Sequence, residues 1–149
     1  DLRRASVGEA AVAALPGGYG EAALVRPRLG QRSFRIAVLD SYGRRCTVTG
    51  ERTLPALEAA HIRQFADVPE HSLNNGLLFR ADIHKLFDAG YVTVDPEYRF
   101  VVSKRIREEF ENGRDYYRLN GQAIRLPVNA AERPSAEALA WHNGERYLS

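Results

Sequence analysis

Side chains with acid–base and metal-binding chemistry recur between residues 58 and 88. Glu58 and His61 lie in one short apolar stretch, and His84 and Asp88 are four residues apart in a later one. Residues i and i+4 of a helix leave the same face, and an imidazole beside a carboxylate is half of a site for a divalent cation. His61 would reach the same point if its strand ran antiparallel beside that helix. This pattern indicates metal-assisted hydrolysis, in which a cation stabilises the oxyanion leaving phosphorus while a neutral histidine deprotonates water.

Each of these residues also has an ordinary structural interpretation. A histidine at a strand end is commonly hydrogen-bonded for structural reasons, and an i, i+4 His–Asp pair is commonly a surface pair. Asn75 before Gly76 is typical turn chemistry. Asp82 falls on a different helix face from His84, which favours capping or a salt bridge over ligation. The order and spacing of the whole set, rather than any single residue, favours a functional site.

The elements that would position these residues follow from the apolar spacing. Helical spacing predicts helices over residues 31–42, 77–89, 104–111 and 135–141. Alternating residues over 46–60 predict strand structure, with a turn at Thr49–Glu51 and a second short strand over 57–62. A hairpin is predicted over 91–102. A polar loop is expected over 62–74. The side chains expected in the core are Cys46, Phe79, Leu86 and Phe87, whereas Trp141 is expected to pack and His142 to lie on the surface.

The composition is that of an ordinary globular domain. The chain has 149 residues, 44% hydrophobic and 27% charged, enough to bury a core without disulfides. Its single cysteine excludes a disulfide framework within the chain and an all-cysteine zinc site. No apolar run approaches the ~20 residues of a membrane span and no signal peptide is recognisable, so we expect a cytoplasmic location and no membrane partner. The formal net charge of +2 neither requires nor excludes nucleic acid.

A longer string of residues resembles the HNH endonuclease family, most closely the HNH modules at the C-terminal end of bacterial restriction endonucleases. The similar segments are Cys46–Gly50, Leu57–Ile62, Asn75–Leu78 and Asp82–Gly90, with later likeness at Gly121, Leu126, Pro127, Pro134 and residues 139–142. The resemblance implies an α+β fold: a ββα-metal finger, two strands followed by a helix, embedded in a small mixed domain with flanking helices and a short C-terminal extension.

The resemblance also implies a role for each site residue. His61 would be the general base, Asn75 would orient it by pinning the loop or the backbone nearby, and His84 would be a metal ligand. Asp88 stands where colicin-type DNases of the superfamily have a second ligand on the helix. Glu58 stands where those enzymes hold a carboxylate that steadies an arginine near the phosphate.

Two departures from the family bear on the cofactor. Many members place an Asp or His ligand directly before the base, and here that position is Ala60. The cation would then have fewer protein ligands, which favours Mg²⁺ completed by water and phosphate oxygens, with Mn²⁺ or another transition metal as alternatives. The same departure is compatible with weak metal affinity or lost activity. Because Cys46 stands alone, no structural zinc is expected.

The resemblance implies DNA as the partner and a division of the chain. Residues 1–30, broken by Pro16 and by several glycines, are predicted to be a linker. The chain contains no methionine and begins at Asp1, so we expect it to be a piece of a longer protein with an upstream specificity domain. Residues 31–149 would be the nuclease domain, with its core motif over about 42–103 and an extension over 104–149.

Basic residues around the motif are candidates for phosphate contacts, which set affinity without reading sequence. They are Arg44, Arg45, Arg63, Arg80, Lys104, Arg105 and Arg107. A homodimer is plausible by mechanism, because a single-site nuclease needs two copies for a double-strand cut. The leading hypothesis is a metal-dependent endonuclease module of a restriction or modification-dependent enzyme. The alternatives are a non-cleaving nucleic-acid-binding module with a degenerate finger and a structural domain.

Overall fold

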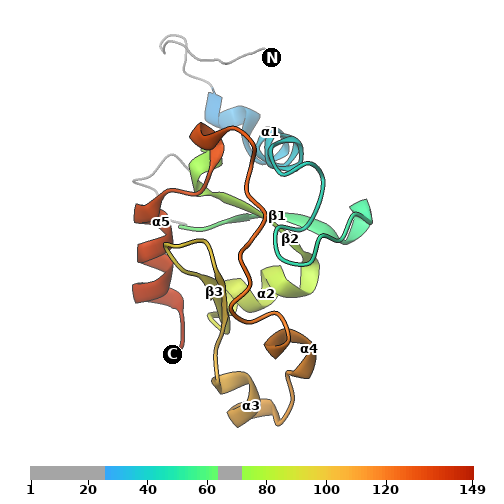
Figure 1. Ribbon diagram of the computed structural model, residues 1–149. Helices are drawn as coiled ribbons and strands as arrows, with labels where there is room; N and C mark the ends of the chain where they lie inside the picture. Colours follow the sequence, from blue (N-terminus) through green and yellow to red (C-terminus); the bar gives the residue numbers. More distant parts are fainter. Residues whose placement is uncertain (1–25, 64–71) are drawn as a thin grey trace. The chain divides into compact units, whose positions relative to one another are not determined.

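The computed structural model describes residues 26–63 and 72–149, with side chains described from Ser33 onward (Figure 1). The chain divides into two compact units, Asp1–Ser33 and Phe34–Ser149. Helix α1 (Arg26–Ser41) spans this division and begins earlier than predicted, since a proline is tolerated in a helix's first turn. Most of the predicted linker lies outside the described residues, so the proposed domain division stays a prediction. The elements that carry the candidate site belong to the second unit.

A two-stranded antiparallel sheet carries the central part of this unit. β1 (Leu57–His61) pairs with β2 (Gly76–Arg80), which places Leu57 opposite Arg80 and His61 opposite Gly76. Helix α2 (Ala81–Ala89) follows β2 directly (Figure 1). It ends at Gly90, whose φ of 90° is a left-handed conformation that glycine adopts readily. Two strands followed by a helix confirm the predicted ββα order and the α+β fold class.

The two faces of this sheet are covered by different helices. Side chains alternate along a strand, so Phe79 points to one face and the neighbouring positions to the other. The Phe79 ring packs against Phe87 of α2 with centroids 5.0 Å apart. On the opposite face, a Cβ built on Gly76 would come within 3.0 Å of the Phe34 ring of α1. The sheet therefore separates an α2 face from an α1 face.

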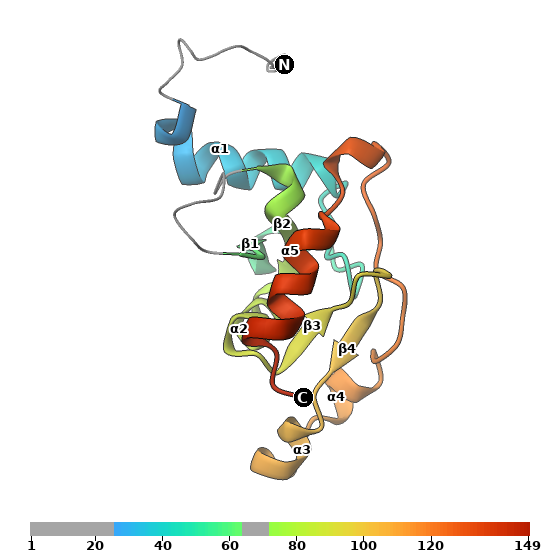
Figure 2. The same ribbon diagram turned by 90° about the vertical axis from the view of Figure 1, so that its left-hand side faces the viewer.

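A second hairpin and the C-terminal elements complete the unit. β3 (Val92–Val94) and β4 (Phe100–Val102) pair antiparallel, which confirms the predicted hairpin. Short helices α3 (Arg105–Phe110) and α4 (Arg114–Tyr117) follow, and α5 (Ala136–Trp141) continues into a π-helical turn, His142–Arg146. Figure 2 shows α5 beside β3, in agreement with a hydrogen bond from Asn143 Nδ2 to the Val94 carbonyl. Single-turn 3-10 helices lie at Leu54–Ala56, Leu73–Asn75 and Ala130–Glu132.

Two secondary-structure predictions are wrong. The helix predicted over 77–89 begins only at Ala81, because Leu77–Arg80 is part of β2. Leu77, Leu78 and Phe79 are fully buried, and a strand buried on both faces gives an unbroken apolar run that spacing alone does not distinguish from a helix. The strand predicted before β1 is absent: a turn lies at residues 47–49, overlapping the turn predicted at 49–51, and a 3-10 helix at Leu54–Ala56. In this turn the Gly50 amide donates to the Cys46 carbonyl and the Cys46 amide to the Glu51 carbonyl.

The core predictions hold with one exception. Cys46, Phe79 and Phe87 are fully buried, and Leu86 is partly buried against them. His142, expected on the surface, is only 1% exposed. Its ring stacks on Phe87 and its Nε2 donates to the Phe87 carbonyl at 2.9 Å, so the C-terminal turn folds it into the core. None of the helices in the described part of the chain combines the length and the apolar character that crossing a bilayer requires.

Candidate functional site

Three of the predicted site residues meet on the α2 face of the sheet. His84 Nδ1 lies 2.7 Å from Oε1 of Glu58 on β1, and His84 Nε2 lies 3.2 Å from Oδ2 of Asp88, one turn further along α2. The antiparallel pairing makes this contact because α2 leaves β2 at Arg80, next to the end of β1 that carries Glu58. The structure thus brings Glu58, His84 and Asp88 together.

Two carboxylates surround the His84 imidazole, whose side chain is 22% exposed. The hydrogen bond to Asp88 raises the pKa of His84 above its ordinary value, burial opposes this rise, and the hydrogen bond to Glu58 adds to it. The neighbouring negative charges therefore favour an imidazolium at this position, and they favour any other cation placed between them for the same reason.

The donor set fits a divalent cation held by two protein side chains. Once Nε2 has released its proton, with Nδ1–H still donating to Glu58, the lone pair of Nε2 faces Asp88, and this is the usual arrangement of a carboxylate that orients a metal-ligating histidine. Two ligand atoms about 2.1 Å from one ion at a right angle lie about 3 Å apart, close to the 3.2 Å between Nε2 and Oδ2. Within residues 26–63 and 72–149, no group of three or more His, Cys, Asp or Glu side chains is placed to hold an ion. Water and phosphate oxygens would have to complete the coordination.

Ala60 explains why this donor set is small. It is fully buried and, two residues from Glu58, points to the same face of β1. The position at which the family commonly has a further ligand is therefore filled here by a methyl group on the α2 side.

His61 lies at the other end of β1. It is three residues from Glu58, so strand alternation directs it to the opposite face. There its ring is stacked on Phe34 of α1, with centroids 4.1 Å apart and an interplanar angle of 8°. The structure consequently does not place His61 on the face where Glu58, His84 and Asp88 meet.

Asn75 clamps the backbone that leaves β1. Its side chain is nearly buried, its Oδ1 accepts from the Arg63 amide at 2.9 Å, and its Nδ2 donates to the Arg63 carbonyl at 2.8 Å. The Asn75 carbonyl also accepts from the amide of Ile62. These bonds fix the two residues that follow His61, and they are of the kind that the resemblance implied for Asn75.

Arg80, one of the predicted phosphate contacts, is already paired. Its guanidinium makes a fork with Asp82, with Nε and Nη2 donating at 2.7 and 3.0 Å. Asp82 also accepts from the Tyr116 hydroxyl at 2.8 Å. The salt bridge predicted for Asp82 is confirmed. Hydrogen bonds from Arg80 lower the pKa of the Asp82 carboxyl, and Asp82 in turn raises the pKa of Arg80. The pair fixes the start of α2.

The other predicted phosphate contacts are spread over several elements. Arg44 is exposed after α1, and Lys104 is exposed just before α3. Arg45 is half-buried, and Arg63 lies 6.0 Å from the centroid of the Trp141 ring.

Sequence reasoning missed the partner of Glu58. It placed this carboxylate beside an arginine, whereas the structure places it against His84. The alternation of side chains along a strand could have indicated this contact, because Glu58 shares a face with Ala60, the position at which the resemblance implies a metal ligand in many members of the family.

Comparisons with known proteins bear on the family and on the fold. Residues 46–95 match the family described as HNH endonuclease. The solved structure of a "Modification dependent TagI restriction endonuclease" is similar with a TM-score of 0.51 and 19% sequence identity, over 76% of this chain. This chain spans 37% of the length of that protein, and at such an identity the likeness concerns the fold. A search of curated proteins by sequence finds no match.

Proposed function

We propose that this chain is a metal-dependent DNA endonuclease module, from the premise that its residues 46–95 match the HNH endonuclease family. That match confirms the resemblance stated from the sequence and the enzyme class, a nuclease that hydrolyses phosphodiester bonds. The roles of individual residues, the cation and the biological setting are parts of the proposal.

The observation that carries the proposal is the contact of His84 with two carboxylates. His84 and Asp88 would hold the cation, and Glu58 would fix the ring orientation of His84 through Nδ1. A divalent cation bound there supplies Lewis-acid stabilisation to the oxyanion that leaves phosphorus. We propose Mg²⁺, because two protein ligands leave most coordination positions to water and phosphate oxygens. Mn²⁺ or another transition metal is the alternative.

His61 is proposed as the general base that deprotonates the attacking water. Since His61 and Glu58 lie on opposite faces of β1, the scissile phosphate would have to approach the edge of the sheet. β1 pairs only with β2 among the described strands, so its other edge is not covered by a strand. At that edge, His61 from one face and the cation held by His84 from the other would have to reach the same phosphate. Asn75 supports this role by fixing the backbone beyond His61.

DNA is the proposed substrate, with Arg44, Arg45, Arg63, Arg80 and Lys104 as proposed phosphate contacts. Cleavage specificity would come from an upstream domain in the same chain, and a homodimer would make double-strand cuts. The similar solved structure is that of a modification-dependent restriction endonuclease, and this supports a restriction or modification-dependent enzyme as the whole protein. The proposal keeps the cytoplasmic location predicted from the sequence, because the substrate requires a compartment that contains DNA.

A second candidate is a nucleic-acid-binding module that does not cleave. Two observations favour it: Ala60 fills the place of a ligand, and His61 lies across the sheet from His84. It predicts that DNA is retained without metal-dependent nicking.

A plasmid-nicking assay separates the two candidates. Wild type, His61→Ala and His84→Ala are incubated with supercoiled plasmid in Mg²⁺, in Mn²⁺ and in a chelator. Nicking that requires metal and disappears in both variants supports the endonuclease. Retention of DNA without nicking by wild type supports the binding module, and loss of both activities contradicts both candidates.

A further inference from the structure

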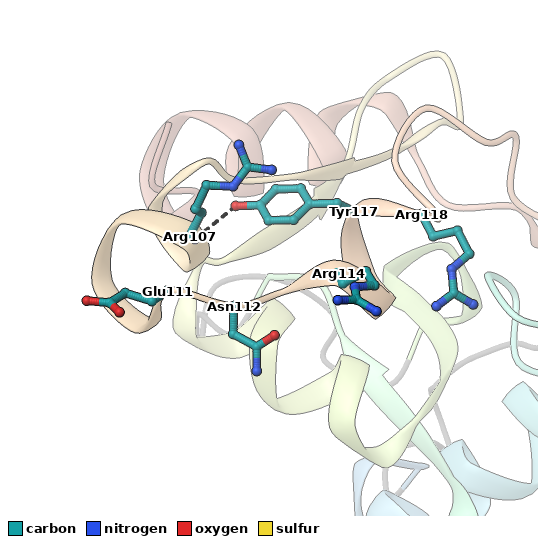
Figure 3. A pocket seen from close by; sticks show the side chains of 6 residues that line it. All are labelled: Arg107, Glu111, Asn112, Arg114, Tyr117 and Arg118. Carbon is teal, nitrogen blue, oxygen red and sulfur yellow. Dashed lines mark hydrogen bonds between the residues drawn. The ribbon is translucent and has the colours of Figure 1, made fainter.

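An open pocket of about 740 Å³ lies between α3 and α4, outside the segment that matches the endonuclease family (Figure 3). It is lined by Arg107, Glu111, Asn112, Arg114, Tyr117 and Arg118. The proposed cleavage chemistry uses none of these side chains. Of the three arginines in the pocket, only Arg107 is among the phosphate contacts predicted from the sequence. The size of the pocket falls within the ~300–1,000 Å³ typical of ligand sites.

The pocket is strongly basic. Three arginine charges face one carboxylate, Glu111, and Figure 3 shows Glu111 at the far end of the pocket from Arg118. Among the described residues, the Arg114 guanidinium has no hydrogen-bond or ion-pair partner, and Arg118 is paired only with the exposed Asp115, at 2.6 Å. The Arg114 guanidinium is therefore available to an anion, and the Arg118 guanidinium would meet one beside its exposed ion pair with Asp115.

The wall of the pocket is built by close packing. Gly113, between α3 and α4, has a φ of 112°, and a Cβ there would lie 2.7 Å from Ile106 and 2.8 Å from the Tyr117 ring. The Tyr117 hydroxyl donates to the Ser103 carbonyl at 2.7 Å and accepts from the Arg107 amide at 3.0 Å. The Arg107 guanidinium lies 5.0 Å from the Tyr117 ring centroid, in a cation–π contact that orients it.

The pocket is also tied to the candidate metal site. Tyr116, next to Tyr117 on α4, donates its hydroxyl proton to Asp82 at 2.8 Å. Asp82 lies two residues before His84 on α2, and it is held from the other side by Arg80. A strand bound in the pocket would therefore be held at a fixed position relative to His84.

We propose that this pocket binds phosphodiester groups of a DNA strand away from the scissile phosphate. The planar guanidinium fork matches a phosphate in shape as well as charge, and an open pocket of this size admits a segment of backbone. Such contacts add affinity and fix register without reading sequence. The inference rests on the proposed function, since it names a second contact region on the same substrate.

Salt-dependent DNA binding in a chelator tests the proposal without cleavage. The variant is Arg114→Gln/Arg118→Gln, both at exposed positions, and the control is Arg99→Gln, an exposed arginine outside the pocket. Each lost phosphate contact lowers the slope of log K against log salt by about 1. For the double variant we expect the slope of log K against log salt to decrease in magnitude by about 2. We also expect its DNA affinity at about 0.1 M salt to fall about 10- to 100-fold, whereas Arg99→Gln should match wild type in both quantities. An unchanged slope in the double variant overturns the proposal.

Two further experiments are needed. One distinguishes DNA phosphates from a free phosphate ligand, and the other separates this inference from the proposed function. Titration with inorganic phosphate and with a deoxynucleoside monophosphate is followed by NMR. Tight binding of either in the pocket, with DNA binding unaffected by the double variant, assigns a free ligand and overturns the proposal. If the double variant nicks plasmid and binds DNA like wild type, only this inference fails. If wild type neither binds nor nicks DNA, the proposed function fails and this inference with it.

Discussion

His84 Nδ1 lies 2.7 Å from Glu58 Oε1, so one imidazole joins the sheet to helix α2. The contact leaves Nε2 directed toward Asp88, 3.2 Å away. A carboxylate on the other nitrogen of a ligating histidine fixes both its tautomer and its orientation, and removing such a partner costs about 10- to 100-fold in metal affinity.

Glu58 should control metal affinity through its contact with His84. Glu58→Ala should weaken Mn²⁺ binding about 10- to 100-fold in a calorimetric titration, and Glu58→Gln should weaken it less, because the amide oxygen still accepts from Nδ1–H. Glu108→Ala, at an exposed position on α3, is the control. Equal Mn²⁺ affinity in wild type and Glu58→Ala would exclude Glu58 from the metal site.

Asn75 should affect cleavage without affecting metal binding. Asn75→Ala leaves the amide and carbonyl of Arg63 without their side-chain partner, which costs about 1–3 kcal/mol in a urea denaturation experiment. The backbone after His61 then loosens, so the rate of plasmid nicking should fall while Mn²⁺ affinity stays the same.

Its neighbour Asn74 is the matched control. Asn74 Nδ2 donates to the carbonyls of Ala131 and Arg133, far in sequence from His61. Asn74→Ala should therefore lower stability but leave the nicking rate of the folded protein unchanged. A similar loss of nicking in both variants would show that Asn75 acts through stability alone.

Much of the site could be predicted because its signals are local. His84 and Asp88 are one helical turn apart, and this spacing alone predicts that both side chains lie on the same face of the helix. Gly90 ends α2 in a left-handed conformation and Ser135 caps α5 by accepting from the Ala138 amide, and both residue types mark helix boundaries in a sequence. The predicted start of α2 was wrong because Leu77, Leu78 and Phe79 are all fully buried in β2, and a continuous apolar run does not distinguish a buried strand from a helix.

What could not be predicted depends on contacts between distant segments. The burial of His142 depends on Phe87, 55 residues earlier, and on Thr93. The position of His61 is a different case. The odd spacing between residues 58 and 61 already indicates opposite faces of a strand, but the stacking partner Phe34 belongs to a helix outside the motif.

Ala60 offers a gain-of-function prediction. Ala60→Asp places a carboxylate on the α2 face, near the Glu58–His84–Asp88 cluster, and should raise Mn²⁺ affinity in calorimetry. Without metal the buried charge should lower the melting temperature, and Mn²⁺ should restore it. Ala59→Asp, on the α1 face, is the control and should show no Mn²⁺-dependent recovery. Equal affinity in Ala60→Asp and wild type would place the cation elsewhere.

The stability of the protein should depend on pH through the buried side chain of His142. Burial lowers the pKa of His142 from 6.5 to about 4; the hydrogen bond to Phe87 and the charge of Asp88 oppose this shift, and Arg146 adds to it. In the unfolded chain His142 takes up a proton near pH 6.5, whereas the folded protein does so only near pH 4. The free energy of unfolding should therefore fall as the pH drops through this window, by about 3 kcal/mol in total, and His142 should contribute no pH dependence above it.

The variant His142→Gln isolates this contribution. Glutamine can still hydrogen-bond but does not titrate, so the difference in unfolding free energy between wild type and variant should vary between pH 6.5 and pH 4 and be constant above. The raised pKa of His84 acts in the opposite sense, since its stabilisation is complete below pH 6.5 and is lost as the pH rises through its folded pKa. Because His84 is present in both proteins, its effect cancels in the difference. A difference that does not change with pH between 6.5 and 4 would mean that His142 is protonated as readily in the folded protein as in the unfolded chain, contrary to its burial against Phe87.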